Sequence, residues 1–177
     1  MSPAHAQPKK AGQHAARPDT AFVHAVKAAG LTPAAGKGAV EGKYSASIVA
    51  TKEGAVFTGS VDLDTQFKAA ESRSNRWDYG VGIKDRGQPE CAIWIEPHSG
   101  TSAGEVAVIL AKLKWLQAKL ESPTFHPLKV LTAEAIRQGK TPYVWLASGK
   151  VGIRAGSREA RQLASAGMRL PMSQARI

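Results

Sequence analysis

The sequence predicts one α/β domain, an α/β sandwich around a mixed central sheet. Its 177 residues, 43% of them hydrophobic, are enough for a single domain with a continuous core. Short runs in which apolar residues alternate with other residues fill the middle of the chain, as is typical of strands. A long segment with a helical period, residues 102–122, follows these runs and precedes one more apolar run. Helices and strands in this order favour helices packed on a sheet.

The N-terminal end carries no strand or helix pattern. Residues 1–17 are rich in alanine, proline and basic side chains and have no hydrophobic period, so we expect a disordered basic arm. The single domain is expected to span residues 18–177. Its first helix covers "PDTAFVHAVKAAG", where Asp19 or Thr20 can cap the start and Gly30 can end the helix.

Four strands are predicted between this first helix and the long helix. Residues 43–54 and 55–67 form two strands around a glycine turn, and "WDYGVGI" and "CAIWIE" form two more. Alternation along the second strand puts Asp62 and Asp64 on one face. This Asp-x-Asp pair could bind a metal ion, but a solvent-facing strand surface is the simpler interpretation.

Residues 102–122 contain the strongest helix signal of the sequence. Ser102 can cap this helix, with Glu105 three residues later completing a capping box. Apolar residues recur on one face and predict a buried stripe of Val106, Ile109, Leu110, Leu113, Leu116 and Leu120. Beyond it we expect a strand at residues 141–148 and a short closing helix at residues 156–167.

The net charge of +10 makes nucleic acid the leading partner, ahead of an anionic membrane surface. The charge is uneven along the chain. Residues 51–100 carry six basic and eight acidic residues, whereas residues 101–177 carry twelve basic and four acidic residues. An acidic centre framed by basic surface suits a site that holds both a metal ion and a phosphate chain. Chance clustering of solvated charges explains the same counts.

Cysteine content and hydropathy exclude several classes of protein. The single cysteine, Cys91, allows no intramolecular disulfide and no thiolate metal cluster. No run approaches the roughly 18 apolar residues of a membrane span. The N-terminal residues also lack the apolar core of a secretory signal. The expectation is therefore a cytoplasmic protein with no membrane partner.

Two acidic residues lie in apolar runs, where a charged side chain is disfavoured. Asp78 stands near the start of "RWDYGVGI", and Glu96 ends the apolar part of "ECAIWIEPH". If these two strands pair as a hairpin, both carboxylates can sit at the same end of the sheet. A shared cation is the simplest explanation, and carboxylate oxygens are the ligands that Mg²⁺ and Mn²⁺ prefer. We therefore expect Asp78 and Glu96 to hold Mg²⁺ or Mn²⁺.

The predicted arrangement resembles the core of the PD-(D/E)XK nuclease superfamily. That core has an acid at the start of one strand, an acidic motif on the next strand and then a helix packed on the sheet. The resemblance covers roughly residues 19–148 and implies a restriction-endonuclease-like fold. It also implies metal-dependent cleavage of phosphodiester bonds, with Asp78 as the first acid and Glu96 as the Glu of the Glu-x-Lys element. The chain departs from the family pattern in having Trp77 in place of proline and His98 in place of lysine.

The missing lysine leaves two candidates for the catalytic residue that would replace it. His98 can orient or deprotonate a water molecule near neutral pH. Lys112, near the middle of the long helix, could instead reach over the sheet to the scissile phosphate. Each has a simpler interpretation: His98 as a loop residue hydrogen-bonded to Glu96, and Lys112 as part of a solvated helix face. Because Pro97 bends the chain just before His98, we favour Lys112.

Basic and aromatic side chains near these motifs are candidates for binding nucleic acid. The basic residues that could clamp phosphates are Arg73, Arg76, Lys84, Arg86, Lys114, Arg154, Arg158 and Arg161. The aromatic residues that offer stacking faces for bases are Trp77, Tyr79, Trp94 and Trp115. Aromatic residues in strands are more often part of the core.

The predicted function is a metal-dependent nuclease that cleaves phosphodiester bonds in DNA or RNA. The alternative is a non-catalytic, basic nucleic-acid-binding or assembly protein with a degenerate nuclease-like core. A third interpretation is a structural or partner subunit whose charge aids solubility. A homo-oligomer or a larger nucleoprotein complex is compatible with the first two.

Overall fold

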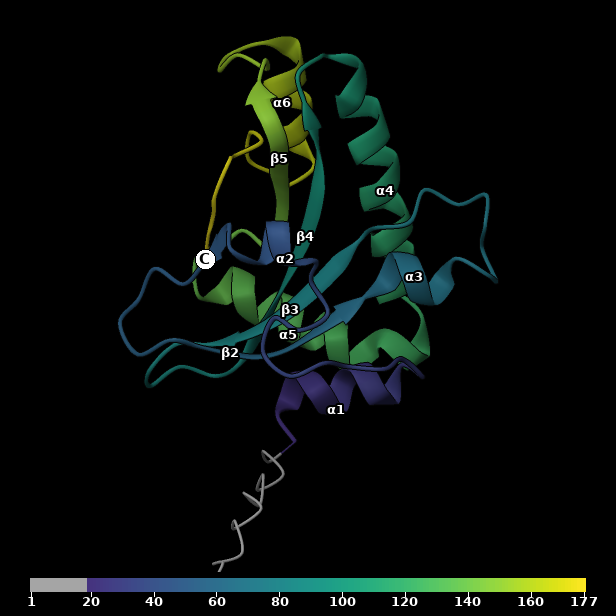
Figure 1. Ribbon diagram of the computed structural model, residues 1–177, viewed down its shortest axis with the longest axis vertical. Helices are drawn as coiled ribbons and strands as arrows, with labels where there is room; N and C mark the ends of the chain where they lie inside the picture. Colours follow the sequence, from purple (N-terminus) through teal and green to yellow (C-terminus); the bar gives the residue numbers. More distant parts are fainter. Residues whose placement is uncertain (1–18) are drawn as a thin grey trace, which may run out of the picture.

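A four-stranded mixed sheet forms the centre of the protein (Figure 1). The computed structural model describes residues 19–177, so the arm predicted at residues 1–17 lies outside the described residues. The strand order is β2-β3-β4-β5. The bounds are Val56–Asp62 for β2, Tyr79–Lys84 for β3, Cys91–Gly100 for β4 and Tyr143–Val151 for β5. The first three strands pair antiparallel, and β5 pairs parallel with β4. These pairings confirm the predicted mixed α/β architecture.

Helices cover one face of this sheet. Parallel strands need a crossover, and the one between β4 and β5 consists of α4 (Gly104–Leu120), a short 3₁₀ helix (Pro123–Phe125) and α5 (His126–Arg137). The first helix, α1 (Ala21–Ala28), contacts β2 and α5. Thr20 caps α1 as predicted, because its side chain accepts a hydrogen bond from the Val23 backbone.

Strand alternation divides the core into two apolar clusters on opposite faces of the sheet. On β4, Trp94 faces the helices and joins a cluster with Trp77 and Trp145. Its neighbours Ile93 and Ile95 join the cluster on the other face. Glu96 is two residues beyond Trp94, so its side chain points toward the helical layer, as Trp94 does. The sheet thereby directs a carboxylate into the interface with α4.

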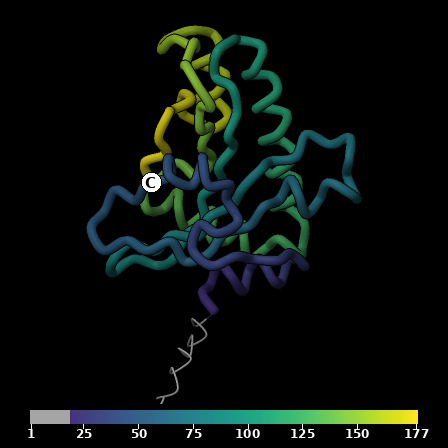
Figure 2. The backbone as a smooth tube through the Cα atoms, viewed as in Figure 1, coloured from purple at the N-terminus to yellow at the C-terminus, as the bar shows by residue number. Residues whose placement is uncertain are grey.

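A small second sheet covers the face opposite the helices. It consists of β1 (Ile48–Val49) and β6 (Ala175–Arg176), which pair in parallel. Figure 2 shows the C-terminal end of the chain running beside the segment that follows α2 (Gly42–Ser45). The backbone carbonyl of Ile177 accepts hydrogen bonds from Thr51, which ties the C-terminal residues to this layer.

Several predicted elements differ from the structure. The strand predicted at residues 43–54 is α2 followed by the two-residue β1, and it lies outside the main sheet. The strand predicted at residues 55–67 ends at Asp62, whose side chain accepts from the Thr65 backbone and caps α3 (Leu63–Phe67). Asp62 and Asp64 therefore do not share a strand face.

The helical layer also contains an element that the sequence did not predict. The buried side of α5 includes the polar residues Thr132 and Glu134, so no continuous apolar stripe marks this helix. Thr132 accepts a hydrogen bond from the Trp94 indole and anchors α5 to β4. The predicted capping box of the long helix is wrong, because α4 begins at Gly104 without a side-chain cap.

The strand predicted after the long helix and the closing helix are both present, whereas the short β6 was not predicted. The strand at residues 141–148 is β5, and the closing helix is α6 (Arg158–Ser165), capped by the Ser157 hydroxyl.

Within residues 19–177, none of the helices combines the length and the apolar character that crossing a bilayer requires.

The packing of α1 on the sheet depends on Gly82 in β3. A Cβ atom at this position would lie 2.5 Å from the Cβ atom of Phe22 and 2.5 Å from the Thr58 hydroxyl. We therefore expect Gly82→Ala to lower the free energy of unfolding by about 1–3 kcal/mol, as overpacking of a core does. Urea denaturation measures this change.

Gly42→Ala is the matched control, because a Cβ atom there meets no atom within 4 Å. It should change the free energy of unfolding by no more than about 0.5–1 kcal/mol. Equal stability of the two variants would contradict the close packing of α1 against β3.

Candidate active site

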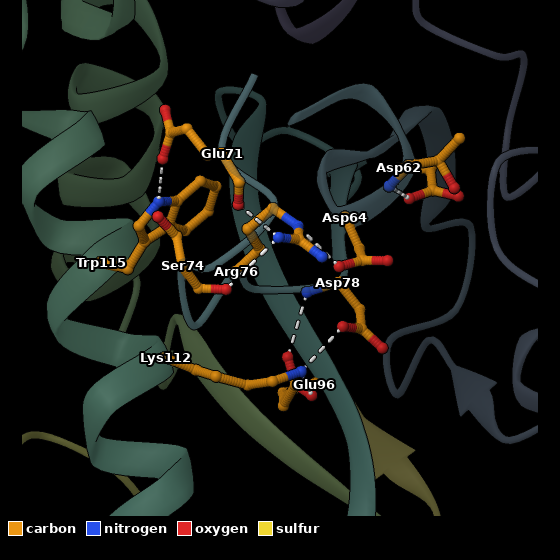
Figure 3. Close-up of polar contacts among 10 residues, drawn as sticks. Asp62, Asp64, Glu71, Ser74, Arg76, Asp78, Glu96, Lys112 and Trp115 are labelled. Atoms are coloured by element: carbon orange, nitrogen blue, oxygen red, sulfur yellow. Dashed lines mark hydrogen bonds and ion pairs between the residues drawn. The ribbon is translucent and has the colours of Figure 1, made fainter. Parts of the chain in front are cut away.

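The antiparallel pairing of β3 with β4 brings Asp78 and Glu96 together. Tyr79 pairs with Ile95, so Asp78, just before β3, lies opposite Glu96. The backbone N–H of Asp78 donates to the Oε2 atom of Glu96 at 3.0 Å. Because the strand alternation turns Glu96 toward the helical layer, both acidic residues lie next to α4 (Figure 3).

Lys112, in the middle of α4, completes this arrangement. Its Nζ atom lies 2.9 Å from the Oδ1 atom of Asp78 and also donates to the Oε1 atom of Glu96. One ammonium group therefore bridges the two carboxylates. The Glu96 side chain is 0% exposed, and those of Lys112 and Asp78 are 17% and 24% exposed. We name Asp78, Glu96 and Lys112 the acid–lysine triad.

Burial dominates the ionisation of the triad. It raises the pKa of Glu96 to about 8, and the negative charge of Asp78 acts in the same direction against the opposing effect of Lys112. Burial also raises the pKa of Asp78. Burial alone would lower the pKa of Lys112, but the two carboxylates outweigh it, so this pKa is raised. The lysine therefore stays charged at neutral pH, whereas burial favours the protonated form of Glu96 there.

Two further acidic residues near Asp78 have partners of their own (Figure 3). Asp64 accepts from the Arg76 guanidinium at 2.9 Å, and Asp62 caps α3. Both raise the pKa of Asp78 through their charge. Arg76 also donates to the backbone carbonyl of Glu71, so it fixes the loop that leads into β3. Arg76, a predicted phosphate clamp, is therefore committed to internal contacts.

His98 lies apart from the triad's polar contacts. Pro97 does not interrupt the strand, because β4 continues to Gly100. The His98 Nε2 atom lies 2.7 Å from the Glu105 carboxylate on α4, and its backbone carbonyl accepts from the Trp145 indole. The His98 ring therefore joins β4 to the first turn of α4.

The predicted phosphate-binding residues are dispersed over the surface. Arg73 lies in the loop that precedes Asp78, and Lys114 lies on α4. Lys84 ends β3, about 20 Å along the strand from Asp78, and Arg86 follows it in the turn. Arg158 and Arg161 lie on α6, just after Arg154.

Glu71, Trp115 and Lys119 form a polar cluster beside the triad that was not predicted from the sequence. Glu71 accepts from the Trp115 indole at 2.7 Å and also forms an ion pair with Lys119. Trp115 and Lys119 are four residues apart on α4, so they share a helix flank with Lys112. This spacing was readable from the sequence, but no local pattern marks Glu71 as their partner.

The triad offers two carboxylates to a metal ion. Within residues 19–177, no group of three or more histidine, cysteine, aspartate and glutamate side chains is close enough to hold one. Two carboxylates still fit Mg²⁺ or Mn²⁺, because such ions retain several waters and take further oxygens from substrate phosphate. Asp78 and Glu96 fit because both already direct an oxygen toward one cation, the Lys112 ammonium.

Comparison of the chain with protein-family models, with curated proteins and with solved structures found no match.

The pKa of Glu96 predicts how stability depends on pH when chelator removes divalent ions. Its folded-state pKa is about 8, against an ordinary value of 4.5, so between these values the folded chain holds a proton that the unfolded chain has lost. The contribution of Glu96 to stability is therefore lost as pH rises from about 5 to 8, by up to about 1.4 kcal/mol per pH unit.

Urea denaturation of the wild type and of Glu96→Gln at pH 5 and pH 8 measures this effect. The variant cannot ionise at this position, so it should gain stability relative to the wild type as pH rises. Lys112 does not interfere, because its raised pKa affects stability only at strongly basic pH. A difference between the two proteins that stays constant with pH would show that Glu96 is ionised throughout.

Proposed function

We propose that the protein is a metal-dependent nuclease of the restriction-endonuclease-like fold that hydrolyses phosphodiester bonds in DNA or RNA. The observation that carries this proposal is the convergence of Asp78, Glu96 and Lys112 on one point beside the central sheet. The three residues come from the start of β3, from β4 and from α4. They match the two acids and the lysine of the PD-(D/E)XK pattern, with the lysine supplied by the helix.

The topology supports the same proposal. The element order α1, β2, β3, β4, α4 and β5 is a helix, an antiparallel three-strand meander, a crossover helix and a parallel fourth strand. This is the order that the PD-(D/E)XK resemblance implies. Glu96 lies on β4 and Asp78 immediately precedes β3, at the end of β3 that receives the loop from α3.

Asp78 and Glu96 would hold the metal ion in this proposal. When bound, Mg²⁺ or Mn²⁺ lowers the pKa of a water molecule and stabilises negative charge on the phosphoryl group. Glu96 must give up its proton to act as a ligand, and because its pKa is raised to about 8 the bound cation has to displace that proton near neutral pH. The Asp78 backbone N–H holds the Glu96 carboxylate in place.

Lys112 acts in this proposal as a permanent positive charge. Its pKa is raised by the two carboxylates, so it is protonated at neutral pH and cannot serve as a general base. An ammonium group held beside the reacting phosphate stabilises the charge that develops during attack. His98 is less suited to this role, because its ring is paired with Glu105.

The charge distribution supports nucleic acid as the substrate. The chain has a net charge of +10, and twelve of its basic residues lie in residues 101–177. Such an excess attracts a phosphate backbone, and the attraction weakens steeply as salt rises. Acidic residues concentrate near the triad, which suits a centre that uses a cation to receive phosphate.

Lys112→Ala should lower the rate of cleavage about 100-fold or more, as loss of one preorganised charge does. Asp78→Asn should abolish cleavage, because it removes one of the two ligand carboxylates. His98→Ala should cost less than Lys112→Ala. The assay follows cleavage of labelled single-stranded and duplex DNA and RNA with Mg²⁺ or Mn²⁺, and EDTA should stop the reaction.

Lys129→Ala on α5 is the matched control, because Lys129 is an exposed lysine that pairs with Glu121. It should cleave as the wild type does. Circular dichroism should show that each variant is folded. Loss of activity in His98→Ala with normal activity in Lys112→Ala would reverse the roles. Wild-type protein that binds nucleic acid but never cleaves it would instead support a non-catalytic binding protein.

A further inference from the structure

An aromatic pocket lies along α4 next to the triad. It has a volume of about 530 Å³ and is lined by residues from the end of α1, from α3 and its following loop, from α4 and from the 3₁₀ segment. Its rings are Phe67, Trp115 and Phe125, and its charged groups are Glu71 and Lys119. The rings of Phe67 and Trp115 meet edge to face at 5.4 Å.

The pocket and the triad are neighbours on one helix flank. Lys112 and Trp115 are three residues apart on α4, a rise of about 4.5 Å. Figure 3 shows Trp115 between Lys112 and Glu71 along this side of α4. The same loop carries Glu71 and leads to Asp78, and Arg76 ties it by donating to the Glu71 carbonyl. A nucleotide that flanks a phosphate at the triad is therefore within reach of the pocket.

The polar groups of the pocket suit a nucleotide. Lys119 pairs with the Glu71 carboxylate and holds its pKa below the ordinary value, so this carboxylate is ionised and accepts N–H donors. The Lys119 ammonium lies 4.3 Å from the centre of the Phe67 ring and 5.4 Å from the centre of the Trp115 ring. The rings can receive a base face, and the Glu71–Lys119 pair places polar groups at the edge of that stacking surface.

Trp115 differs from the other three tryptophans of the chain. Trp77, Trp94 and Trp145 are at most 1% exposed, so they belong to the core. Trp115 is partly exposed, although its ring is as large and as apolar as theirs. A partly exposed indole in a pocket that also holds paired charges is typical of a binding surface.

We propose that this aromatic pocket binds an unpaired nucleobase adjacent to the scissile phosphate, so that the substrate is single-stranded nucleic acid. The proposal rests on the proposed nuclease function. In a duplex, both faces of a base are covered by its neighbours, so a base reaches an aromatic ring only when it leaves the stack. A single strand meets no such cost, and stacking on aromatic side chains is the usual means of binding it.

Tryptophan fluorescence tests this proposal directly. A 12-residue oligothymidylate, added in buffer with EDTA so that no cleavage occurs, should quench the emission of the wild type. The quench should disappear in Trp115→Phe, because the three remaining tryptophans are buried. A duplex of the same length should bind more weakly and quench little. Fluorescence anisotropy of labelled oligonucleotides measures both affinities.

Side-chain variants then separate stacking from a structural role. Trp115→Ala should weaken oligothymidylate binding about 10-fold to 100-fold, and Trp115→Phe should restore most of the affinity because it keeps an aromatic ring. Val108→Ala is the control, since Val108 is exposed on the same flank of α4, one turn before Lys112 and outside the pocket. It should bind as the wild type does.

Three results would overturn the inference. The wild type could fail to bind oligothymidylate, Trp115→Ala could bind it normally, or a duplex could bind and quench the tryptophan emission as strongly as the single strand does. These results are independent of cleavage. If the wild type cleaves duplex with Mn²⁺ but does not bind the oligothymidylate, the proposed nuclease function stands and the proposed binding of a base in this pocket is wrong. If binding quenches Trp115 but the wild type never cleaves, the pocket binds a base and the proposed nuclease function is wrong.

Discussion

The Glu96 carboxylate is fully buried, and it must be either protonated or paired. Glu96 is two residues after Trp94 on β4, so the two side chains lie on the same face of the sheet. The alternation that buries Trp94 among the helices therefore also turns Glu96 toward α4. The Lys112 ammonium and the Asp78 backbone N–H satisfy both carboxylate oxygens. This one side chain therefore joins α4 to the residue that precedes β3.

The interactions of Glu96 define the site more than they stabilise the fold. The attraction within a buried ion pair offsets little more than the free energy needed to remove its charges from water. Apolar packing on both faces of the sheet stabilises the domain instead. An apolar residue at position 96 would fit the same interface at lower cost. A carboxylate with a pKa of about 8 beside a lysine is instead typical of a functional site.

Much of the site and part of the fold could be predicted from the sequence. Period-two alternation located Asp78 and Glu96, and the helical period of residues 102–122 placed Lys112 on the correct element. Other features depend on tertiary contacts. Asp62 ends a strand because it caps α3, and α5 buries Thr132 because the Trp94 indole reaches it. The pairing of His98 with Glu105 likewise requires β4 to continue past Pro97 and to meet α4.

We propose that Asp78 and Glu96 together bind a divalent cation that catalysis requires. Diffraction from crystals soaked in Mn²⁺, recorded at a wavelength where manganese scatters anomalously, tests it most directly. We expect one anomalous peak bonded to oxygens of both carboxylates at about 2.1–2.2 Å. We also expect that the Lys112 ammonium moves away from the position that the ion takes. Saturating Mn²⁺ with no peak there, and with Lys112 still bridging both acids, would contradict the account.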